Sequence, residues 1–275
     1  MFIISINYTN IHAMKIKMYQ VDAFTEKLFG GNPAAVCILD KWLSDDLMQS
    51  IAAENNLAET AFIIKSDEGY DIRWLTPAVE VDLCGHATLA SAHVVFNHLG
   101  HSSDEVVFHS GRSGILKVKK TGSLLTLDFP TDQFVKVDTP SNLAKGLGMQ
   151  PVETYKGKTD YMAVFSSEAD IVKLEPHFNV LAGVEARGII VTAKGDTVDF
   201  VSRFFAPQSG IDEDPVTGSA HTTLTPYWAG VLGKTEMSAI QLSARKGHLT
   251  CKHLGTRVEI SGHAVTYLVG EIEVV

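Results

Sequence analysis

Cysteine is scarce in this chain of 275 residues, which contains only Cys37, Cys84 and Cys251. Their long spacing gives neither a CxxC pair nor an even set that would form a disulfide framework. Free thiols are typical of proteins in a reducing compartment. The cytoplasm is therefore the predicted location.

Long apolar runs are also missing. The apolar opening at residues 2–6 is too short for the hydrophobic part of a signal peptide, and no basic segment precedes it. No later run approaches the length of a membrane span, so no membrane association is expected. Met14 and Met18 stand just before the first strand-like pattern, so residues 1–13 are left out of the predicted core.

Basic residues are outnumbered, with 23 Lys and Arg against 32 Asp and Glu, a net charge of −9. Such a surface repels a phosphate backbone, so a nucleic-acid partner is not expected. The proportions of 45% hydrophobic and 20% charged residues are typical of a globular protein. The length predicts about two domains, each large enough to bury its own core.

Metal and nucleotide motifs are absent from the sequence. The 11 histidines form no HExxH pattern, and neither GxGxxG after a strand nor a Walker A loop occurs. No metal and no cofactor are therefore expected. A Ser–His–Asp hydrolase using Ser219, His221 and Asp214 is disfavoured, because residues two apart on a helix do not face each other and no GxSxG motif is present.

Strand patterns dominate the first half of the chain. They predict strands at residues 16–24, 34–39, 59–65, 70–75, 105–110, 114–119 and 124–129. Ser44 is a typical N-cap for a helix that ends at Asn55 and Asn56. Residues 85–99 are small or apolar nearly all round, which indicates a wholly buried helix.

The chain also contains an internal duplication. At an offset of 130 residues, Arg73-Trp74-Leu75-Thr76-Pro77 aligns with Arg203-Phe204-Phe205-Ala206-Pro207. Each stretch precedes an acidic residue and a predicted helix that opens on glycine: Asp82 with Gly85-His86-Ala87, and Asp214 with Gly218-Ser219-Ala220. We therefore predict two similar halves, residues 14–133 and 134–263, with a cleft between them. Whether residues 264–275 return to the first half is left open.

The two glycine-opened helix starts have two interpretations. Helix N-termini carry unsatisfied N–H groups and a partial positive charge, so two that face one cleft would hold a carboxylate. Alternatively, Gly85 and Gly218 only permit tight packing, while His86 and Ser219 cap their helices.

Glu59 stands where a predicted helix gives way to an apolar strand, between Ala58 and Ala61. Burial there would raise the pKa of its carboxyl towards neutrality, where the group can both take and return a proton. A solvated surface glutamate is the simpler alternative. Among the histidines, His86 is the best placed to act near a substrate.

Five motifs, taken in order, make the chain resemble the PhzF-like proteins, the phenazine-biosynthesis isomerase family. They are Val21-Asp22-Ala23-Phe24, Phe29-Gly30-Gly31-Asn32-Pro33-Ala34-Ala35-Val36, Asn56-Leu57-Ala58-Glu59-Thr60-Ala61-Phe62, Asp82-Leu83-Cys84-Gly85-His86-Ala87-Thr88 and Asp214-Pro215-Val216-Thr217-Gly218-Ser219-Ala220. The resemblance implies an α+β, diaminopimelate-epimerase-like fold. Its two pseudo-symmetric halves each wrap a β-barrel-like sheet around a central helix, usually in a homodimer.

The resemblance also implies a chemistry, which is cofactor-independent isomerisation. Glu59 would move a proton between carbons of a small cyclic carboxylate such as dihydro-hydroxyanthranilate, acting as general base and acid. The residues matching the rest of the family's catalytic set are His86, Asp214 and Ser219. The positions matching substrate contacts are Asn32, Gly85 and Gly218.

Two other functions stay open. An amino-acid epimerase of the same fold uses two opposed cysteines; the helix N-terminus would lower the pKa of Cys84, but the counterpart of Cys84 is Thr217. A carboxylate-binding protein without catalysis would keep the same fold. The polar segment after Ala220 leaves the substrate's shape open, and Pro226 would shorten or bend the second helix.

Overall fold

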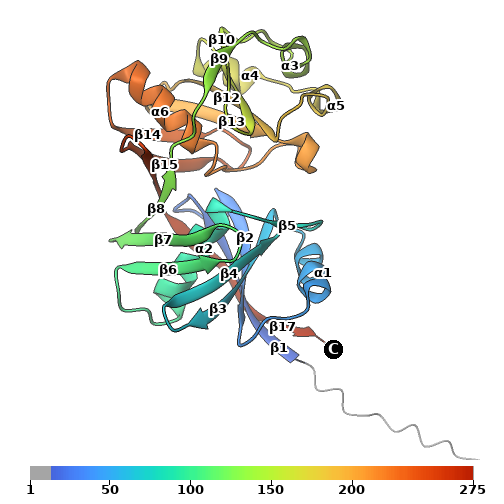
Figure 1. Cartoon of the computed structure of the whole chain (residues 1–275), viewed down its shortest axis with the longest axis vertical. Coiled ribbons are helices and arrows are strands. Elements are labelled where there is room, and N and C mark those ends of the chain that lie inside the picture. The colour runs from blue at the N-terminus through green and yellow to red at the C-terminus, as the bar shows by residue number, and fades with distance from the viewer. Residues whose placement is uncertain (1–13, 275) are drawn as a thin grey trace, which may run out of the picture.

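The computed structural model describes residues 14–274 as two halves stacked on each other across a narrow waist (Figure 1). The first half contains β1 (Met14–Ala23), β2 (Asn32–Leu39), α1 (Asp45–Asn55), β3 (Glu59–Ser66), β4 (Gly69–Leu75), β5 (Glu80–Val81), α2 (Gly85–His98), β6 (Glu105–Ser110), β7 (Gly114–Thr121) and β8 (Leu124–Pro130). The second half contains β9 (Val135–Val137), α3 (Ser141–Leu147), β10 (Glu153–Lys156), β11 (Asp160–Val164), α4 (Glu168–Lys173), α5 (Phe178–Leu181), β12 (Gly188–Lys194), β13 (Phe200–Phe205), a 3₁₀ turn (Pro207–Ser209), α6 (His221–Leu232), β14 (Glu236–Gln241), β15 (Gly247–His253) and β16 (Arg257–Gly262). The last strand is β17 (Ala264–Val274).

The two halves repeat one order of strand pairing. In the first half, β1–β2, β3–β4, β6–β7 and β7–β8 are antiparallel, whereas β2–β3 and β4–β6 are parallel. In the second half, β10–β11, β12–β13, β14–β15 and β15–β16 are antiparallel, whereas β11–β12 and β13–β14 are parallel. Parallel neighbours need a crossover, and each crossover carries helix: α1 and α2 in the first half, α4 with α5 and α6 in the second. The predicted α+β fold of two pseudo-symmetric halves is confirmed.

The first half is completed by a strand from the other end of the described chain. Strand β17 pairs antiparallel with β1 along its whole length, from Met14 opposite Val274 to Ala23 opposite Ala264. Strands β8 and β16 pair with each other at the waist. The predicted limits of the halves, 14–133 and 134–263, stay a prediction.

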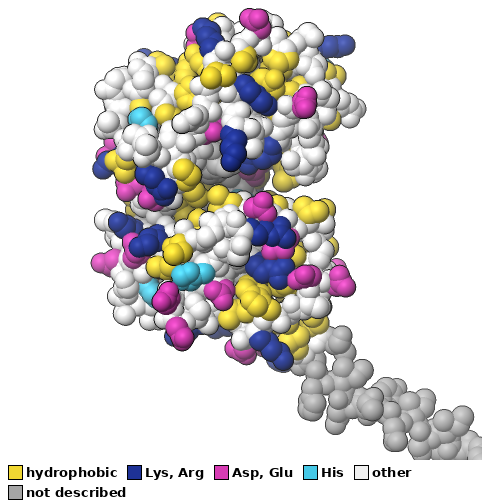
Figure 2. All heavy atoms as spheres, in the orientation of Figure 1, with side chains coloured by type: hydrophobic (Ala, Val, Ile, Leu, Met, Phe, Trp, Pro, Cys, Tyr) yellow, Lys and Arg dark blue, Asp and Glu magenta, His cyan; other side chains and the backbone are white. Residues whose placement is uncertain are grey.

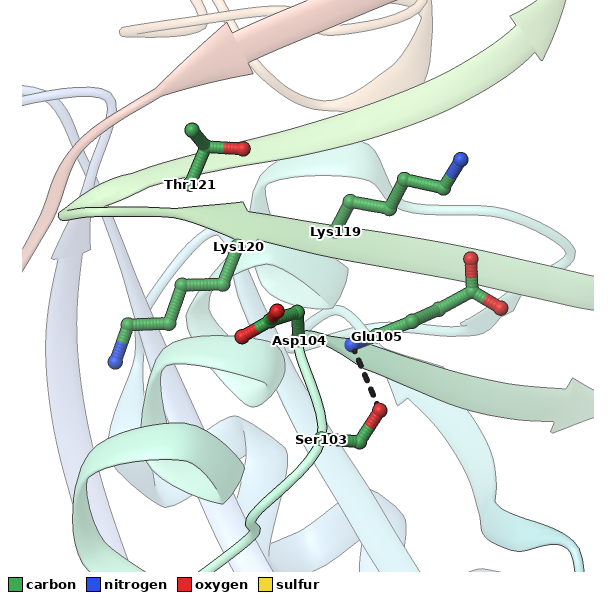
Figure 3. A pocket seen from close by; sticks show the side chains of 6 residues that line it. All are labelled: Ser103, Asp104, Glu105, Lys119, Lys120 and Thr121. Atoms are coloured by element: carbon green, nitrogen blue, oxygen red, sulfur yellow. Dashed lines mark hydrogen bonds between the residues drawn. The ribbon is translucent and has the colours of Figure 1, made fainter.

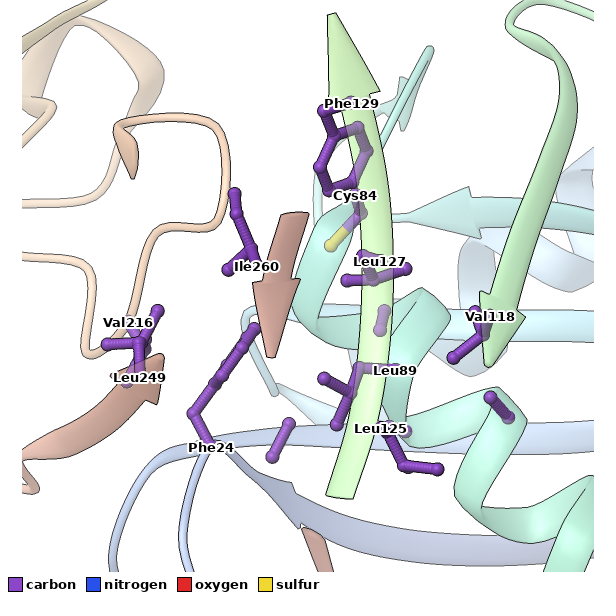
Figure 4. Packing of buried hydrophobic residues seen from close by; sticks show 14 of the residues in the cluster. Phe24, Cys84, Leu89, Val118, Leu125, Leu127, Phe129, Val216, Leu249 and Ile260 are labelled. Carbon is purple, nitrogen blue, oxygen red and sulfur yellow. The ribbon is translucent and has the colours of Figure 1, made fainter. Parts of the chain in front are cut away.

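Helix α2 packs against the strands of the first half, and helix α6 packs against those of the second. Ten of the 14 residues of α2 are buried, as expected for a helix that is apolar all round. Its buried hydroxyls are satisfied within the helix, since Thr88 Oγ1 donates to the Cys84 carbonyl and Ser91 Oγ to that of Ala87. One apolar core runs through both halves, and Figure 4 shows it between Phe24, Leu127 and Val216. This shared core holds the two helix starts in place.

The second central helix begins later than predicted. The sequence placed its start at Gly218, but residues 218–220 form a turn and α6 begins at His221. The helix continues through Pro226 to Leu232, so the prediction that Pro226 shortens it is wrong. Proline has no N–H for the Thr222 carbonyl one turn earlier, and the backbone N–H of Asp132 donates to that carbonyl at 3.2 Å.

The surface in Figure 2 carries acidic and basic side chains side by side over both halves, with a notch at the waist. None of the helices in the described part of the chain has the length and apolarity that crossing a bilayer would take.

Candidate functional site

Two equivalent ion pairs fix the loops that lead to the central helices. Arg73 Nε and Nη2 donate to the two carboxylate oxygens of Glu80 at 2.8 and 2.7 Å. Arg203 Nε and Nη2 donate in the same way to Glu213 at 2.8 and 2.9 Å. Two parallel bonds fix both distance and orientation, so each pair holds its loop firmly.

The acidic residues that the duplication aligned are not equivalent. Asp82 is exposed, and its carboxylate accepts from Arg112 Nη1 at 3.1 Å. Asp214, by contrast, lies in the waist between the halves, where its carboxylate accepts from Asn32 at 2.8 Å. Asp82 and Asp214 therefore have different surroundings, and the equivalent acidic residues of the two halves are Glu80 and Glu213, which pair with the repeated arginines.

Gly85 and Gly218 face each other across the waist. A Cβ added to Gly85 would lie 3.6 Å from Gly218 Cα and 3.6 Å from the Phe129 ring, and one on Gly218 would lie 3.6 Å from Gly85 Cα. These are ordinary contacts, so packing does not require glycine at either position. The backbone N–H groups of Gly85, His86, Gly218 and Ser219 donate to no acceptor found within residues 14–274. Open N–H groups beside glycines favour the approach of an anion.

Neither His86 nor Ser219 caps its helix. The N-cap residues of α2 and α6 are Cys84 and Ala220, and neither makes a side-chain capping bond. The interpretation that reduced both residues to helix caps is therefore wrong.

Glu59 and His86 meet in the first half of the waist. Glu59 is the first residue of β3, opposite Ala34 of β2, and its Oε2 lies 3.2 Å from His86 Nε2. The other ring nitrogen, Nδ1, faces two possible donors, Asn32 Nδ2 at 3.2 Å and Cys84 Sγ at 3.5 Å. Burial lowers the pKa of His86 to about 3, so the ring is neutral. A neutral ring that accepts at Nδ1 carries its proton on Nε2, towards Glu59.

The carboxyl group of Glu59 is protonated at neutral pH. Burial, and after it the nearby Asp214 carboxylate, raise its pKa to about 8. Burial also raises the pKa of Asp214, to about 6, although hydrogen bonds from Thr217 and Asn32 oppose this rise. The two acids thus have separate titration ranges in one site, an arrangement that suits proton transfer near neutral pH.

Asn32 connects the two halves. It is fully buried in the first half, and its Nδ2 lies 2.8 Å from Asp214 Oδ1 and 2.9 Å from the Val216 carbonyl in the second. Among residues 14–274 its Oδ1 has no hydrogen-bond partner, and neither do Glu59 Oε2 and His86 Nε2, which approach each other without the alignment of a hydrogen bond. Buried polar atoms are normally paired, so three unpaired ones together indicate a binding site for a polar ligand.

Sequence reasoning missed two polar residues that hold Asp214. The fully buried Gln241 accepts from the Thr217 N–H at 2.8 Å and donates to the Asp214 carbonyl at 2.8 Å. Thr217 Oγ1 in turn donates to the Asp214 carboxylate. Thr217 lies within the fifth motif, but Gln241 ends a distant strand, and no local pattern marks it.

Ser219 lies apart from the group around Glu59. Its Oγ accepts from Arg187 Nη1 at 3.0 Å, and no hydrogen bond found in the described chain joins it to Glu59, His86 or Asp214. The structure therefore brings Asn32, Glu59, His86 and Asp214 together, with the two glycines beside them. Sequence reasoning also missed Arg187. This residue directly precedes β12, so it corresponds to Ala58, which directly precedes β3.

The geometry disfavours the thiol and hydrolase alternatives. Burial and the nearby Glu59 raise the pKa of Cys84 well above its ordinary value, so the expected lowering by the helix N-terminus is wrong. The counterpart of Cys84 in the second half is Thr217, whose hydroxyl donates a hydrogen bond to the Asp214 carboxylate. His221 Nδ1 faces the Thr217 carbonyl at 2.8 Å rather than Ser219, so no Ser–His–Asp triad forms.

One cluster within the site has groups that bind metals elsewhere. Glu59, Cys84 and His86 offer ligand atoms within 4.8 Å of one another. The Nε2 that faces Glu59 carries the proton of the neutral ring, however, and a metal ligand needs a free lone pair there. The expected absence of a metal stays a prediction.

One hollow away from the waist lacks the buried, unpaired groups of the candidate site. Figure 3 shows this hollow between the start of β6 and the end of β7, with a volume of about 370 Å³. It is lined by Ser103, Asp104, Glu105, Lys119, Lys120 and Thr121. Of its charged side chains, Glu105 pairs with Lys117 and Lys120 donates to Asn97, so these groups are satisfied at the surface.

Comparison with known proteins identifies the family. The family model described as phenazine biosynthesis-like protein matches residues 21–270. An uncharacterized isomerase of Pseudomonas aeruginosa is 50% identical over 259 residues, which cover 94% of this chain and 99% of the relative. The crystal structure of a PhzF-family protein from Enterococcus faecalis superimposes with a TM-score of 0.91 at 46% identity, over 94% of this chain and 99% of that one.

A more distant structure supports the fold alone. A hydroxyproline epimerase from Agrobacterium vitis has a TM-score of 0.61 at 12% identity, over 94% of this chain and 93% of that one. The names of the closer relatives agree with the predicted enzyme class, an isomerase. The chain therefore belongs to the PhzF family of phenazine biosynthesis-like proteins, as its five motifs predicted.

Proposed function

We propose that this isomerase moves a proton between two carbons of a small cyclic carboxylate, with Glu59 as general base and then general acid. The observation that carries the proposal is the buried Glu59 carboxyl, whose Oε2 lies unpaired 3.2 Å from the equally unpaired His86 Nε2. Unpaired acid and base atoms in a closed site favour proton transfer over a structural role.

The proton balance needs no other reagent. In the ionised form that it reaches as the pH approaches about 8, Glu59 takes a proton from a carbon next to a double bond, and the electron pair is delocalised over the substrate's unsaturated system. The same carboxylic acid then protonates another carbon of that system, so the double bond moves and Glu59 returns to its starting state. His86 Nε2–H and the Asp214 carboxylate are proposed to hold polar substituents or to help move the proton.

The open N–H groups at the two helix starts support binding of the substrate carboxylate. Gly85 and Gly218 place no side chain over these groups, and Asn32 Oδ1, unpaired within residues 14–274, can accept from a hydroxyl or amino group. The partial positive charge of helix N-termini favours an anion there, and also favours the negative charge that develops during proton removal.

The test is deuterium incorporation. We would incubate the wild type, Glu59→Gln and the control Glu236→Gln in D₂O with a panel of cyclic hydroxy-amino carboxylates and common α-amino acids. Glu236 is exposed on β14, away from the waist. NMR would detect deuterium at carbon or a moved double bond. The expected result is exchange with the wild type and Glu236→Gln that is lost in Glu59→Gln.

Other outcomes separate the alternatives. Exchange only at α-carbons of amino acids, independent of Glu59, would favour the two-base epimerase. Binding of the carboxylates without any exchange would favour a binding protein.

We also propose that the enzyme forms a homodimer through β17. Within the described residues this strand pairs only with β1, so its other edge is free along an exposed apolar stretch, Tyr267, Leu268 and Val269. The three cysteines are all buried and free, which supports the cytoplasmic location as a further proposal.

A further inference from the structure

The two halves place unlike side chains near corresponding positions beside the waist, since Arg187 corresponds to Ala58, one residue before Glu59. In the first half, Glu59 starts the strand β3, and its carboxyl approaches His86, the second residue of α2. In the second half, Arg187 precedes the matching strand β12 and donates to Ser219, which follows Gly218 as His86 follows Gly85. The pseudo-symmetry therefore sets an acid and base on one side and a cation on the other.

The guanidinium of Arg187 is held in a fixed orientation. Its Nε donates to Asp160 Oδ1 at 2.9 Å, and its Nη2 donates to the other oxygen of the same carboxylate. Its plane also lies over the Phe204 ring, 5.4 Å from the ring centre. Asp160 is buried, whereas the Arg187 side chain is 41% exposed. The two bonds to Asp160 use Nε and Nη2, so Nη1 is left on the side of Ser219, to which it donates.

The charges around Arg187 are nearly all negative. Burial lowers its pKa, but Asp160, and at longer range Asp214 and Asp132, raise it above its ordinary value. Lys158 and Lys156 lie in the same half, but Lys156 Nζ lies over the Tyr161 ring and donates to the Glu185 carbonyl. Arg187 is thus the guanidinium beside the open N–H groups of Gly218 and Ser219.

We propose that Arg187 determines specificity by binding an anionic group, a carboxylate, that the substrate presents at Gly218 and Ser219. This inference rests on the proposed function, and it orients the substrate: the carboxylate lies against the second half and the reacting carbons face Glu59. A guanidinium with one open N–H edge recognises a carboxylate better than a neutral amide of the same shape.

The test compares two aromatic probes that cannot isomerise, 2-amino-3-hydroxybenzoate and its primary amide, by isothermal titration calorimetry. Removing Arg187 alone would leave the buried Asp160 without its partner, so the informative variant is Arg187→Gln/Asp160→Asn, which keeps a neutral pair of similar shape. The single variant Asp160→Asn leaves the guanidinium uncompensated. The matched control is Arg257→Gln/Asp128→Asn, an ion pair exposed at 46% and 48%.

The wild type and the control should bind the carboxylate about tenfold or more tightly than the amide. The double variant should lose this preference and keep its affinity for the amide, while Asp160→Asn should strengthen the preference. Thermal unfolding would verify that each variant is folded. The inference is overturned if the double variant still prefers the carboxylate. It is also overturned if the wild type shows no preference, either because it binds both probes equally or because it binds neither.

The calorimetric test of the inference and the deuterium test of the proposed function can fail separately. Deuterium exchange that depends on Glu59, together with a charge preference unaffected by Arg187, would overturn only the inference. Charge selection by Arg187 without any exchange would overturn only the isomerase mechanism.

Discussion

Glu59 combines burial with an acidic neighbour, and both act on its proton. The folded pKa of about 8 lies above its ordinary value of 4.5, so the folded protein binds a proton that the unfolded chain has already released between these pH values. Folding stability from this group is therefore complete below about pH 4.5 and is lost as the pH rises to 8.

This loss of stability with rising pH gives a first prediction. Relative to Glu59→Gln, whose side chain is always neutral, the wild type should lose up to about 1.4 kcal/mol of unfolding free energy per pH unit between pH 5 and 8. Urea unfolding of both proteins at four pH values in this range would measure the difference. Parallel curves for the two proteins would mean that Glu59 is solvated and ionised throughout.

Asp214 has a separate effect on the same proton. Burial is the larger cause of the raised pKa of Glu59, and the charge of Asp214 is the next. We therefore predict that Asp214→Asn lowers the midpoint of the Glu59 titration below about 8 without restoring the ordinary value. The ¹³C shift of glutamate carboxyls, assigned with Glu59→Gln, would report it. Asp128→Asn, an exposed change, should leave the midpoint in place, and an equal shift in both variants would contradict the prediction.

Much of the residue-level site could be predicted, and the reason is local. Asn32, Glu59, His86 and Asp214 all lie in short motifs that join a strand or helix to a loop, so the chain itself marks them. Gln241 and Arg187 could not be found in this way, since each acts through a partner 24 to 32 residues away in sequence that only the sheet brings close. The pKa of Cys84 was misjudged because burial outweighs the helix N-terminus.

Among the elements, the starts of α2 and α6 decide whether the glycines serve packing or binding. A Cβ on Gly85 meets only contacts of 3.6 Å and longer, and alanine is the better helix former. We predict that Gly85→Ala unfolds within a few degrees of the wild type, because a helix gain of about 1 kcal/mol or less offsets the crowding. The same Cβ would occupy the approach to the open N–H groups.

Calorimetry would therefore show carboxylate binding weakened about tenfold or more in Gly85→Ala. A control, Gly230→Ala, at an exposed position of α6 where a Cβ meets nothing within 4 Å, should raise the unfolding temperature slightly and leave binding unchanged. Marked loss of stability in Gly85→Ala with unchanged binding would return these glycines to a packing role.

At the scale of the whole molecule, the duplication was readable because its arginines, aromatics and glycines recur at a nearly constant spacing. The completion of the first half by β17 was not, since β17 alternates weakly and its partner β1 stands at the other end of the described chain. Pairing between such distant segments leaves no local trace in either one.

The free edge of β17 gives a prediction for the assembly. Val269 is 56% exposed, and Phe29, itself 67% exposed, packs edge-on against the neighbouring Tyr267 ring. We predict that Val269→Lys shifts the protein from dimer to monomer in sedimentation experiments, because a lysine on an edge strand opposes pairing with another edge. Val231→Lys, on a valine of α6 that is 57% exposed, should leave the dimer intact. A wild type that sediments as a monomer would contradict the proposal.

The pairing of β1 with β17 also affects how the protein is made. Among the strands of residues 14–274, β1 leaves the ribosome first and its partner β17 last. During translation the first half can close its sheet only on one side of β1, whose other edge stays open until β17 has been made. A chain that terminates before residue 264 would thus carry an exposed edge strand in the half that contains Glu59 and His86, so quality control would detect such truncated products by their ability to aggregate.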